Sequence, residues 1–97
     1  MSPTRTFHVL VRDPVAGGSF QEWVGRLAPD GLWFTMSHPP ARRLQLRFLL
    51  PGAAAEVRAT GEVLRVERRM ERFEVHARLE GLDDEARAAV ERFLEGA

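Results

Sequence analysis

The chain has no cysteine among its 97 residues, and this absence excludes several kinds of site. A disulfide framework, a thiolate zinc site and a cysteine nucleophile all need thiols. There is also no long apolar run, so we expect no membrane-spanning helix. Residues 1–5 (MSPTR) contain no apolar core of the kind found in signal peptides, and we therefore expect a cytoplasmic protein.

Lysine is missing as well, so all 14 basic residues are arginines, and 14 acidic residues bring the net charge to zero. The charges are uneven, because residues 1–50 carry six arginines against three acids while residues 51–97 carry eight against eleven. A composition bias of the source genome is the simplest explanation for the use of arginine. The alternative is selection for the planar guanidinium, which pairs well with carboxylates and phosphates.

Apolar and polar residues alternate along most of the chain, which is the pattern of β-strands. The sequence predicts six strands, at about residues 7–12, 19–28, 31–36, 44–50, 56–67 and 72–80. Gly61, inside the fifth strand, indicates a bulge or bend, and residues 68–71 are expected to connect the last two strands as a hairpin.

The period changes to that of an amphipathic helix over residues 84–95. Its apolar stripe contains Ala86, Ala89, Val90, Phe93 and Leu94. Asp83 can cap the first turn and Gly96 suits the end, and we expect the stripe to cover an open end or a face of the sheet. Because closure removes exposed strand edges, the pattern predicts a mainly β fold in one domain: a six-stranded antiparallel barrel with one C-terminal α-helix.

Three segments, in their order and spacing, carry a resemblance to a known family. Residues 27–34 (LAPDGLWF) have the form Leu-x-x-x-Gly-Leu-x-Phe, and residues 48–52 (FLLPG) and 61–66 (GEVLRV) follow. Together with the predicted barrel and helix, they resemble the PilZ family over about residues 7–94. The resemblance implies a bacterial cytoplasmic receptor or adaptor for the second messenger cyclic di-GMP, in the control of motility, adhesion or polysaccharide export.

That family binds cyclic di-GMP with two signatures, and neither is complete here. The first is Arg-x-x-x-Arg just before the first strand, but this chain has only Arg5 there, and Arg12 belongs to the end of the strand. The second is Asp/Asn-x-Ser-x-x-Gly, which falls on Arg26, Ala28 and Gly31, so only the glycine matches. Each lost polar contact costs about 1 to 3 kcal/mol. We therefore expect no binding of cyclic di-GMP in the family's usual mode, and no other cofactor.

Trp33 is the main candidate for a different function. If Leu32 and Phe34 face the core, Trp33 points outward near Arg26, and this composition is typical of a protein-binding hot spot. The alternative is a reversed or covered strand, and Trp23 raises the same question. We predict a non-enzymatic PilZ-like regulatory or adaptor domain whose partner is a bacterial motility or signalling protein. Its partner-binding face would contain Arg12, Arg26, Asp30 and Trp33.

Two alternative functions stay open at this point. One is a cyclic di-GMP receptor whose arginines have moved, with Arg26 and either Arg5 or Arg12 holding a phosphate beside the backbone of Asp30 and Gly31. The other is a homo-oligomeric scaffold, because a small barrel can leave apolar strand edges open.

Other constellations give weaker signals. Ser37 and His38 with Asp30 suggest a nucleophile and a base, but no oxyanion turn accompanies them, so no catalytic residue is predicted. His8, His38 and His76 lack metal-ligand spacing, and His76 on a polar strand face is predicted to be solvated. The four arginines of residues 65–74 alternate with three glutamates, so we expect a self-paired surface that binds no nucleic acid.

Overall fold

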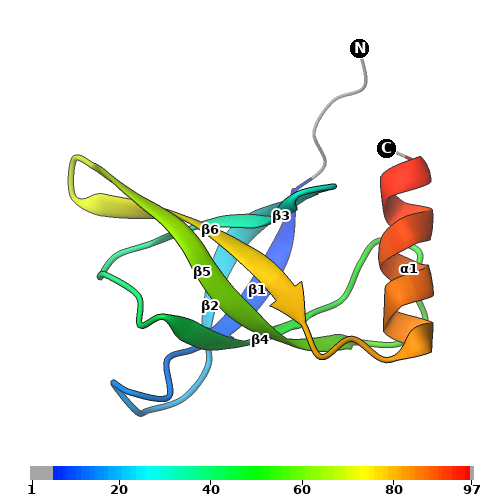
Figure 1. The fold of residues 1–97 in the computed structure, drawn as a ribbon, viewed down its shortest axis with the longest axis horizontal. Helices are drawn as coiled ribbons and strands as arrows, with labels where there is room; N and C mark the ends of the chain where they lie inside the picture. The colour runs from blue at the N-terminus through cyan, green and yellow to red at the C-terminus, as the bar shows by residue number, and fades with distance from the viewer. Residues whose placement is uncertain (1–5, 97) are drawn as a thin grey trace.

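The computed structural model describes residues 6–96, and this part of the chain forms six strands and one helix. The elements are β1 (Thr6–Arg12), β2 (Gln21–Ala28), β3 (Gly31–Met36), β4 (Arg43–Phe48), β5 (Val57–Arg69), β6 (Arg72–Glu80) and α1 (Asp84–Glu95). All neighbouring strands are antiparallel, and they close into a barrel in the order β1-β2-β3-β6-β5-β4 (Figure 1). The predicted six-stranded antiparallel barrel with a C-terminal helix is confirmed.

Three strands begin or end two residues from where they were predicted. β2 begins at Gln21 rather than 19, because the preceding loop is held by side chains: the Arg12 guanidinium donates to the carbonyl oxygen of Gly18 at 3.0 Å. β4 ends at Phe48 rather than 50, before the turn in which the Ala53 amide donates to the Leu50 carbonyl. β5 continues to Arg69 rather than 67, because its pairing with β6 extends to a two-residue turn, residues 70–71.

The inward-facing side chains of all six strands fill the barrel, and those of Val9, Leu32, Leu44 and Val75 are completely buried. Gly61 belongs to this packing, since a Cβ there would lie 2.7 Å from Leu46 Cδ1. The bulge that was predicted at Gly61 lies instead after Val63, where the pairing of β5 with β6 shifts to Arg65. Gly61 therefore makes room for a core side chain, and it does not interrupt the ladder.

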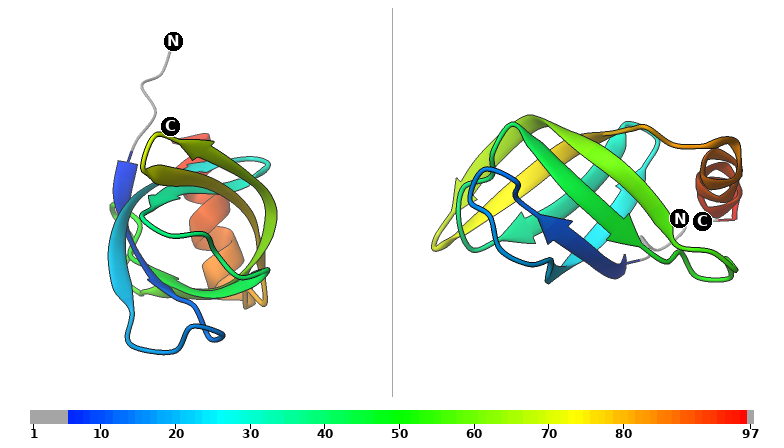
Figure 2. Two further views of the ribbon diagram at one scale, coloured as in Figure 1. Left: turned by 90° about the vertical axis from the view of Figure 1, so that its left-hand side faces the viewer. Right: turned by 90° about the horizontal axis from the view of Figure 1, so that it is seen from below.

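The helix α1 covers one open end of the barrel, as the view along the barrel shows (Figure 2). Phe93, on its apolar stripe, is buried and meets Phe7 edge to face, with 5.7 Å between the ring centroids. Phe7 in turn lies 5.4 Å from Phe48. The carboxylate of Asp83 accepts from the Ala86 amide at 2.7 Å, which is the predicted N-cap. In the part of the chain that the structure describes, no helix is long and apolar enough to cross a membrane.

Candidate functional site

Outward-facing side chains of β2, β3 and β6 form one row across the barrel surface. Arg26 on β2 lies opposite Trp33 on β3, and Trp33 lies opposite His76 on β6. Leu32 and Phe34 are buried inside the barrel, so Trp33 points outward, which decides between the two orientations that the sequence left open. The pairing of the strands thus places a guanidinium, an indole and an imidazole side by side.

These three side chains are stacked against one another. The indole of Trp33 and the imidazole of His76 are parallel to within 5°, with 4.1 Å between their centroids. The Arg26 Cζ atom lies 5.0 Å from the indole centroid, within cation–π range. Because β2 and β6 flank β3 on opposite sides, Arg26 and His76 cover opposite faces of the indole, and the indole edge is what a partner can reach.

His76 differs from the sequence prediction. Its side chain is only 12% exposed, so the prediction that it is solvated is wrong, and the reason is the Trp33 ring lying flat on it. The His76 Nε2 atom is 2.9 Å from the backbone carbonyl oxygen of Asp30 and 3.6 Å from its carboxylate. Since a carbonyl only accepts, Nε2 donates this hydrogen bond. His76 therefore ties the β2–β3 turn to β6 and brings Asp30 next to the stack.

Gly31 is the one residue that matches the second signature, and the structure gives it a packing role. Its φ is 138°, and a Cβ there would lie 2.4 Å from the carbonyl oxygen of Ala77 and 3.1 Å from His76 Nε2. The close approach of β6 therefore requires a glycine independently of any ligand. Ala28, opposite Gly31 in the ladder, adds no polar group to the turn.

Arg12 does not join the other predicted site residues. Arg26 lies opposite Thr6, which is six residues before Arg12 along β1, a separation of about 20 Å at roughly 3.3 Å per residue. Arg12 instead donates to the side-chain oxygen of Gln45 on β4 at 3.1 Å. Arg5 lies outside the described residues. The structure thus brings together Arg26, Asp30 and Trp33, and it separates them from Arg12.

A small pocket of about 140 Å³ lies beside this stack on the outside of the barrel. Val24 of its wall is 57% exposed, which is unusual for a strand valine. Arg26 forms no ion pair with a carboxylate of residues 6–96. We call this surface the tryptophan face, defined by Val24, Arg26, Asp30, Trp33, Thr35 and His76. Glu74, whose carboxylate lies 3.9 Å from Arg69 Nε, also lines the pocket.

The sequence argument missed Val24 and His76 as members of this face. Nothing near His76 in the sequence points to Trp33, because β3 and β6 are separated by two strands along the chain. Val24 precedes Arg26 by two residues on β2, and side chains two residues apart on a strand point to the same side. This spacing could have been used to predict that Val24 belongs to the face. Trp23, by contrast, pairs with Val9 and packs against the core.

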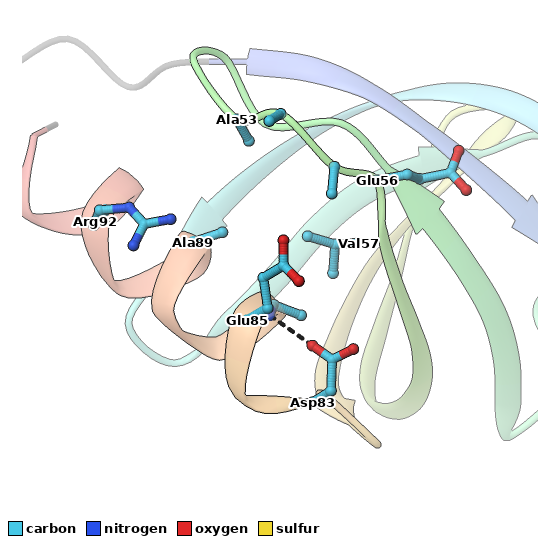
Figure 3. Close-up of a pocket in the computed structure, with 10 residues that line it drawn as sticks. Ala53, Glu56, Val57, Asp83, Glu85, Ala89 and Arg92 are labelled. Carbon is cyan, nitrogen blue, oxygen red and sulfur yellow. Dashed lines mark hydrogen bonds between the residues drawn. The ribbon is translucent and has the colours of Figure 1, made fainter.

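The remaining candidate features do not assemble into a site. Ser37 and His38 follow β3 at its far end, whereas Asp30 precedes it. No group of three or more His, Asp or Glu within residues 6–96 could hold a metal ion. A pocket of about 180 Å³ lies between the β4–β5 loop and α1 (Figure 3). Half of its ten lining residues are alanines, and four are charged: Glu56, Asp83, Glu85 and Arg92. It contains no residue of the predicted sites.

Comparison of the chain with family models, with curated proteins and with solved structures found no match.

Proposed function

We propose that this chain is a non-enzymatic, PilZ-like regulatory or adaptor domain of the bacterial cytoplasm that binds another protein through the tryptophan face. The observation that carries the proposal is Trp33, held between Arg26 and His76 at the edge of a pocket on the barrel surface. The family assignment rests on the order of the three PilZ-like segments, and the barrel with its C-terminal helix supports it. The partner would be a component of motility or second-messenger signalling.

The tryptophan face suits a protein better than a nucleotide. A base could stack on Trp33 only by displacing Arg26 or His76, since each covers one face of the indole. Ala28 and Gly31 supply no hydroxyl or side-chain acceptor in the turn. A pocket of about 140 Å³ is below the usual range of small-molecule sites and accommodates one apolar side chain of a partner.

Charge indicates what should surround that side chain. Arg26 has a cation–π contact but no carboxylate partner within the described chain, so its guanidinium is available for an acidic group of the partner. A rigid aromatic edge and an available arginine are the residue types enriched in binding hot spots. We therefore expect the partner to present an apolar side chain flanked by Asp or Glu.

Site-specific cross-linking in cells tests this proposal. A photoreactive amino acid at Val24, on the tryptophan face, should capture the partner, whereas the same amino acid at Arg87, on the exposed side of α1, should not. The purified partner should then bind Arg26→Glu at least about tenfold more weakly than the wild type, while Arg87→Glu binds normally. Equal affinities of these two variants would contradict the proposal.

Trp33→Ala gives a second measurement but is not a silent change. Loss of the aromatic pair and of the cation–π contact should lower the free energy of unfolding by about 2 kcal/mol. Partner affinity should fall by a further, separate amount of about 2 kcal/mol or more, measured at a temperature where the variant is fully folded. Normal affinity in a folded Trp33→Ala would exclude Trp33 as the anchor.

Titration with cyclic di-GMP distinguishes this proposal from the alternative that the chain is a cyclic di-GMP receptor. Arg12 and Arg26 lie about 20 Å apart at roughly 3.3 Å per residue, so they cannot hold one phosphate together. We expect calorimetric titration to show no binding in the low micromolar range. A low micromolar dissociation constant would overturn our preference in favour of a receptor.

A further inference from the structure

A second groove lies on the outer surface of β4 and β5, on strands that do not contribute to the tryptophan face. Its volume of about 420 Å³ falls within the range of small-molecule sites. Its polar lining consists of Gln45, Arg47, Arg58 and Thr60, and its apolar lining of Phe20, Leu46, Ala59 and Gly81.

Two arginines lie side by side in this groove. Arg47 on β4 is the direct cross-strand neighbour of Arg58 on β5, an arrangement that is repulsive unless an anion compensates it. Glu56 does so in part, because one of its oxygens accepts from the Nε atoms of Arg47 at 2.7 Å and of Arg58 at 3.4 Å. One carboxylate cannot occupy the ten N–H donors of two guanidiniums. A second anion can therefore bind between them.

The guanidinium of Arg47 is held in place before any ligand arrives. Its Cζ atom lies 5.3 Å from the centroid of the Phe20 ring, so the ring and Glu56 together fix its orientation. A positioned guanidinium loses little conformational freedom when it binds an anion, and it presents two parallel N–H groups to a phosphate or carboxylate.

The other polar groups of the groove are also donors. The side-chain oxygen of Gln45 accepts from Arg12, which leaves the Gln45 amide NH₂ as the free end of that side chain. Thr60 is the cross-strand neighbour of Gln45 and adds a hydroxyl. Arg12 itself has no carboxylate partner within residues 6–96. A groove lined by donors is complementary to an anion.

The positive charge is concentrated at this groove. Arg12, Arg47 and Arg58 carry three positive charges, against the single negative charge of Glu56. The next row contains Arg43, Glu62 and Arg78, and its two arginines also pair with Glu80, the cross-strand neighbour of Thr60. The charges of these four side chains therefore balance one another. An anionic ligand is thus drawn to the end of the groove that contains Arg47 and Arg58.

We propose that this groove binds a small phosphate ester. The phosphate lies between Arg47 and Arg58, with the amide of Gln45 and the hydroxyl of Thr60 as further donors. The organic part of the ester lies against Phe20, Ala59 and Gly81. Guanidinium forks and a hydroxyl favour phosphate, and a groove larger than a phosphate ion favours an ester.

Titration calorimetry with two soluble esters, adenosine 5′-monophosphate and glycerol 3-phosphate, tests the proposal. We expect saturable binding of at least one ester with a dissociation constant below about 1 mM, and no binding of adenosine, which lacks the phosphate. Arg58→Gln should weaken this binding about tenfold or more, because it removes a charged fork. Arg87→Gln, an exposed arginine of α1, should leave it unchanged.

Arg58 is a better residue to replace than Arg47, because its side chain is 76% exposed and its loss should not unfold the protein. Arg58→Lys keeps the charge without the fork and should fall between the wild type and Arg58→Gln. Arg26→Glu, on the tryptophan face, should bind the ester as the wild type does, which separates this proposal from the proposed protein interface. Failure of both esters to bind below about 1 mM, or equal binding by Arg58→Gln, would overturn the proposal.

Discussion

Gly31 shows how a residue that matches a binding signature can be required for structural reasons. Its Cα faces the backbone of β6, and its φ of 138° is a conformation that side chains rarely adopt. We expect Gly31→Ala to lower the free energy of unfolding by about 2 kcal/mol or more, because the Cβ would meet the Ala77 carbonyl oxygen at 2.4 Å and this backbone atom cannot move aside. Urea unfolding followed by tryptophan fluorescence measures the loss.

Gly17 provides the matched control for this substitution. It also has a positive φ, 78°, but no atom lies within 4 Å of the position of a Cβ. Gly17→Ala should therefore cost only the backbone strain of about 1 kcal/mol. Equal losses for the two variants would show that the contact with β6 is unimportant.

Individual residues also show which features could be predicted from the sequence and which could not. Strict alternation in residues 31–36 placed Trp33 on the face opposite Leu32 and Phe34, but it did not decide which of the two faces is the core. It could not predict the contact with His76, because that depends on which strands are neighbours in the barrel and in what register. His76 was therefore expected to be solvated, although the stack with Trp33 covers most of it.

Among the elements, α1 is held to the barrel by one large side chain in its last turn. Phe93 is buried against Phe7, and four other apolar residues of the helix pack less completely: Ala86, Ala89, Val90 and Leu94. We expect Phe93→Ala to destabilise the protein by about 3 kcal/mol, because it leaves a cavity at the end of the barrel.

Thermal or urea unfolding measures this effect, with Glu91→Ala on the exposed side of α1 as the control. The control should change stability by less than about 0.5 kcal/mol. A similarly small effect of Phe93→Ala would mean that the helix does not complete the core.

The elements were predicted well where local pattern decides them. β3, β6 and α1 have the expected bounds, since each has a clear period and a turn or cap at its ends. β5 was predicted too short, and its bulge was placed at Gly61 rather than after Val63. Both features depend on pairing with β6, and a glycine in a strand signals close packing as readily as a bulge.

For the whole molecule, closure of the barrel decides which surfaces remain for binding. Each of the six strands has two neighbours, but residues 65–69 of β5 pair only with β6 and residues 21–24 of β2 only with β1, so the described residues keep short open edge segments of the kind that suggested a scaffold. The two proposed sites use different strands. The tryptophan face lies on β2, β3 and β6, and the groove that contains Arg47 and Arg58 lies on β4 and β5. The free-energy effects of substitutions in one site should therefore be additive with those of substitutions in the other.

The donor-lined groove was not predicted, and the reason also lies at this scale. Arg47 and Arg58 are separated in the sequence by a turn and an alanine-rich loop, and nothing local indicates that they lie side by side. Glu56, just before β5, bridges the two guanidiniums and offsets part of their repulsion. The site thus arises from the pairing of two strands and not from a motif.

Stability in acid is a property to which several carboxylates contribute. Burial raises the pKa of Asp13, but hydrogen bonds from the backbone amides of Ala16, Ala41 and Val15 lower it by more, so the net pKa lies below its ordinary value of 3.8. Hydrogen bonds from arginines lower the pKa of Glu56 and of Glu67 in the same way. A carboxyl group with a lowered pKa in the folded state stabilises the fold when ionised.

This contribution is complete above the unfolded pKa and is lost as the pH falls through the lower, folded pKa. We therefore expect the melting temperature to be nearly constant between about pH 7 and 5 and to fall as the pH drops below about 4. Asp13→Asn should melt lower at pH 7, because it loses the charge that joins the β1–β2 loop to Ala41. The melting temperature of this variant should also fall less on acidification, since Asn does not titrate. Scanning calorimetry across this pH range would contradict the assignment if the two proteins gave parallel curves.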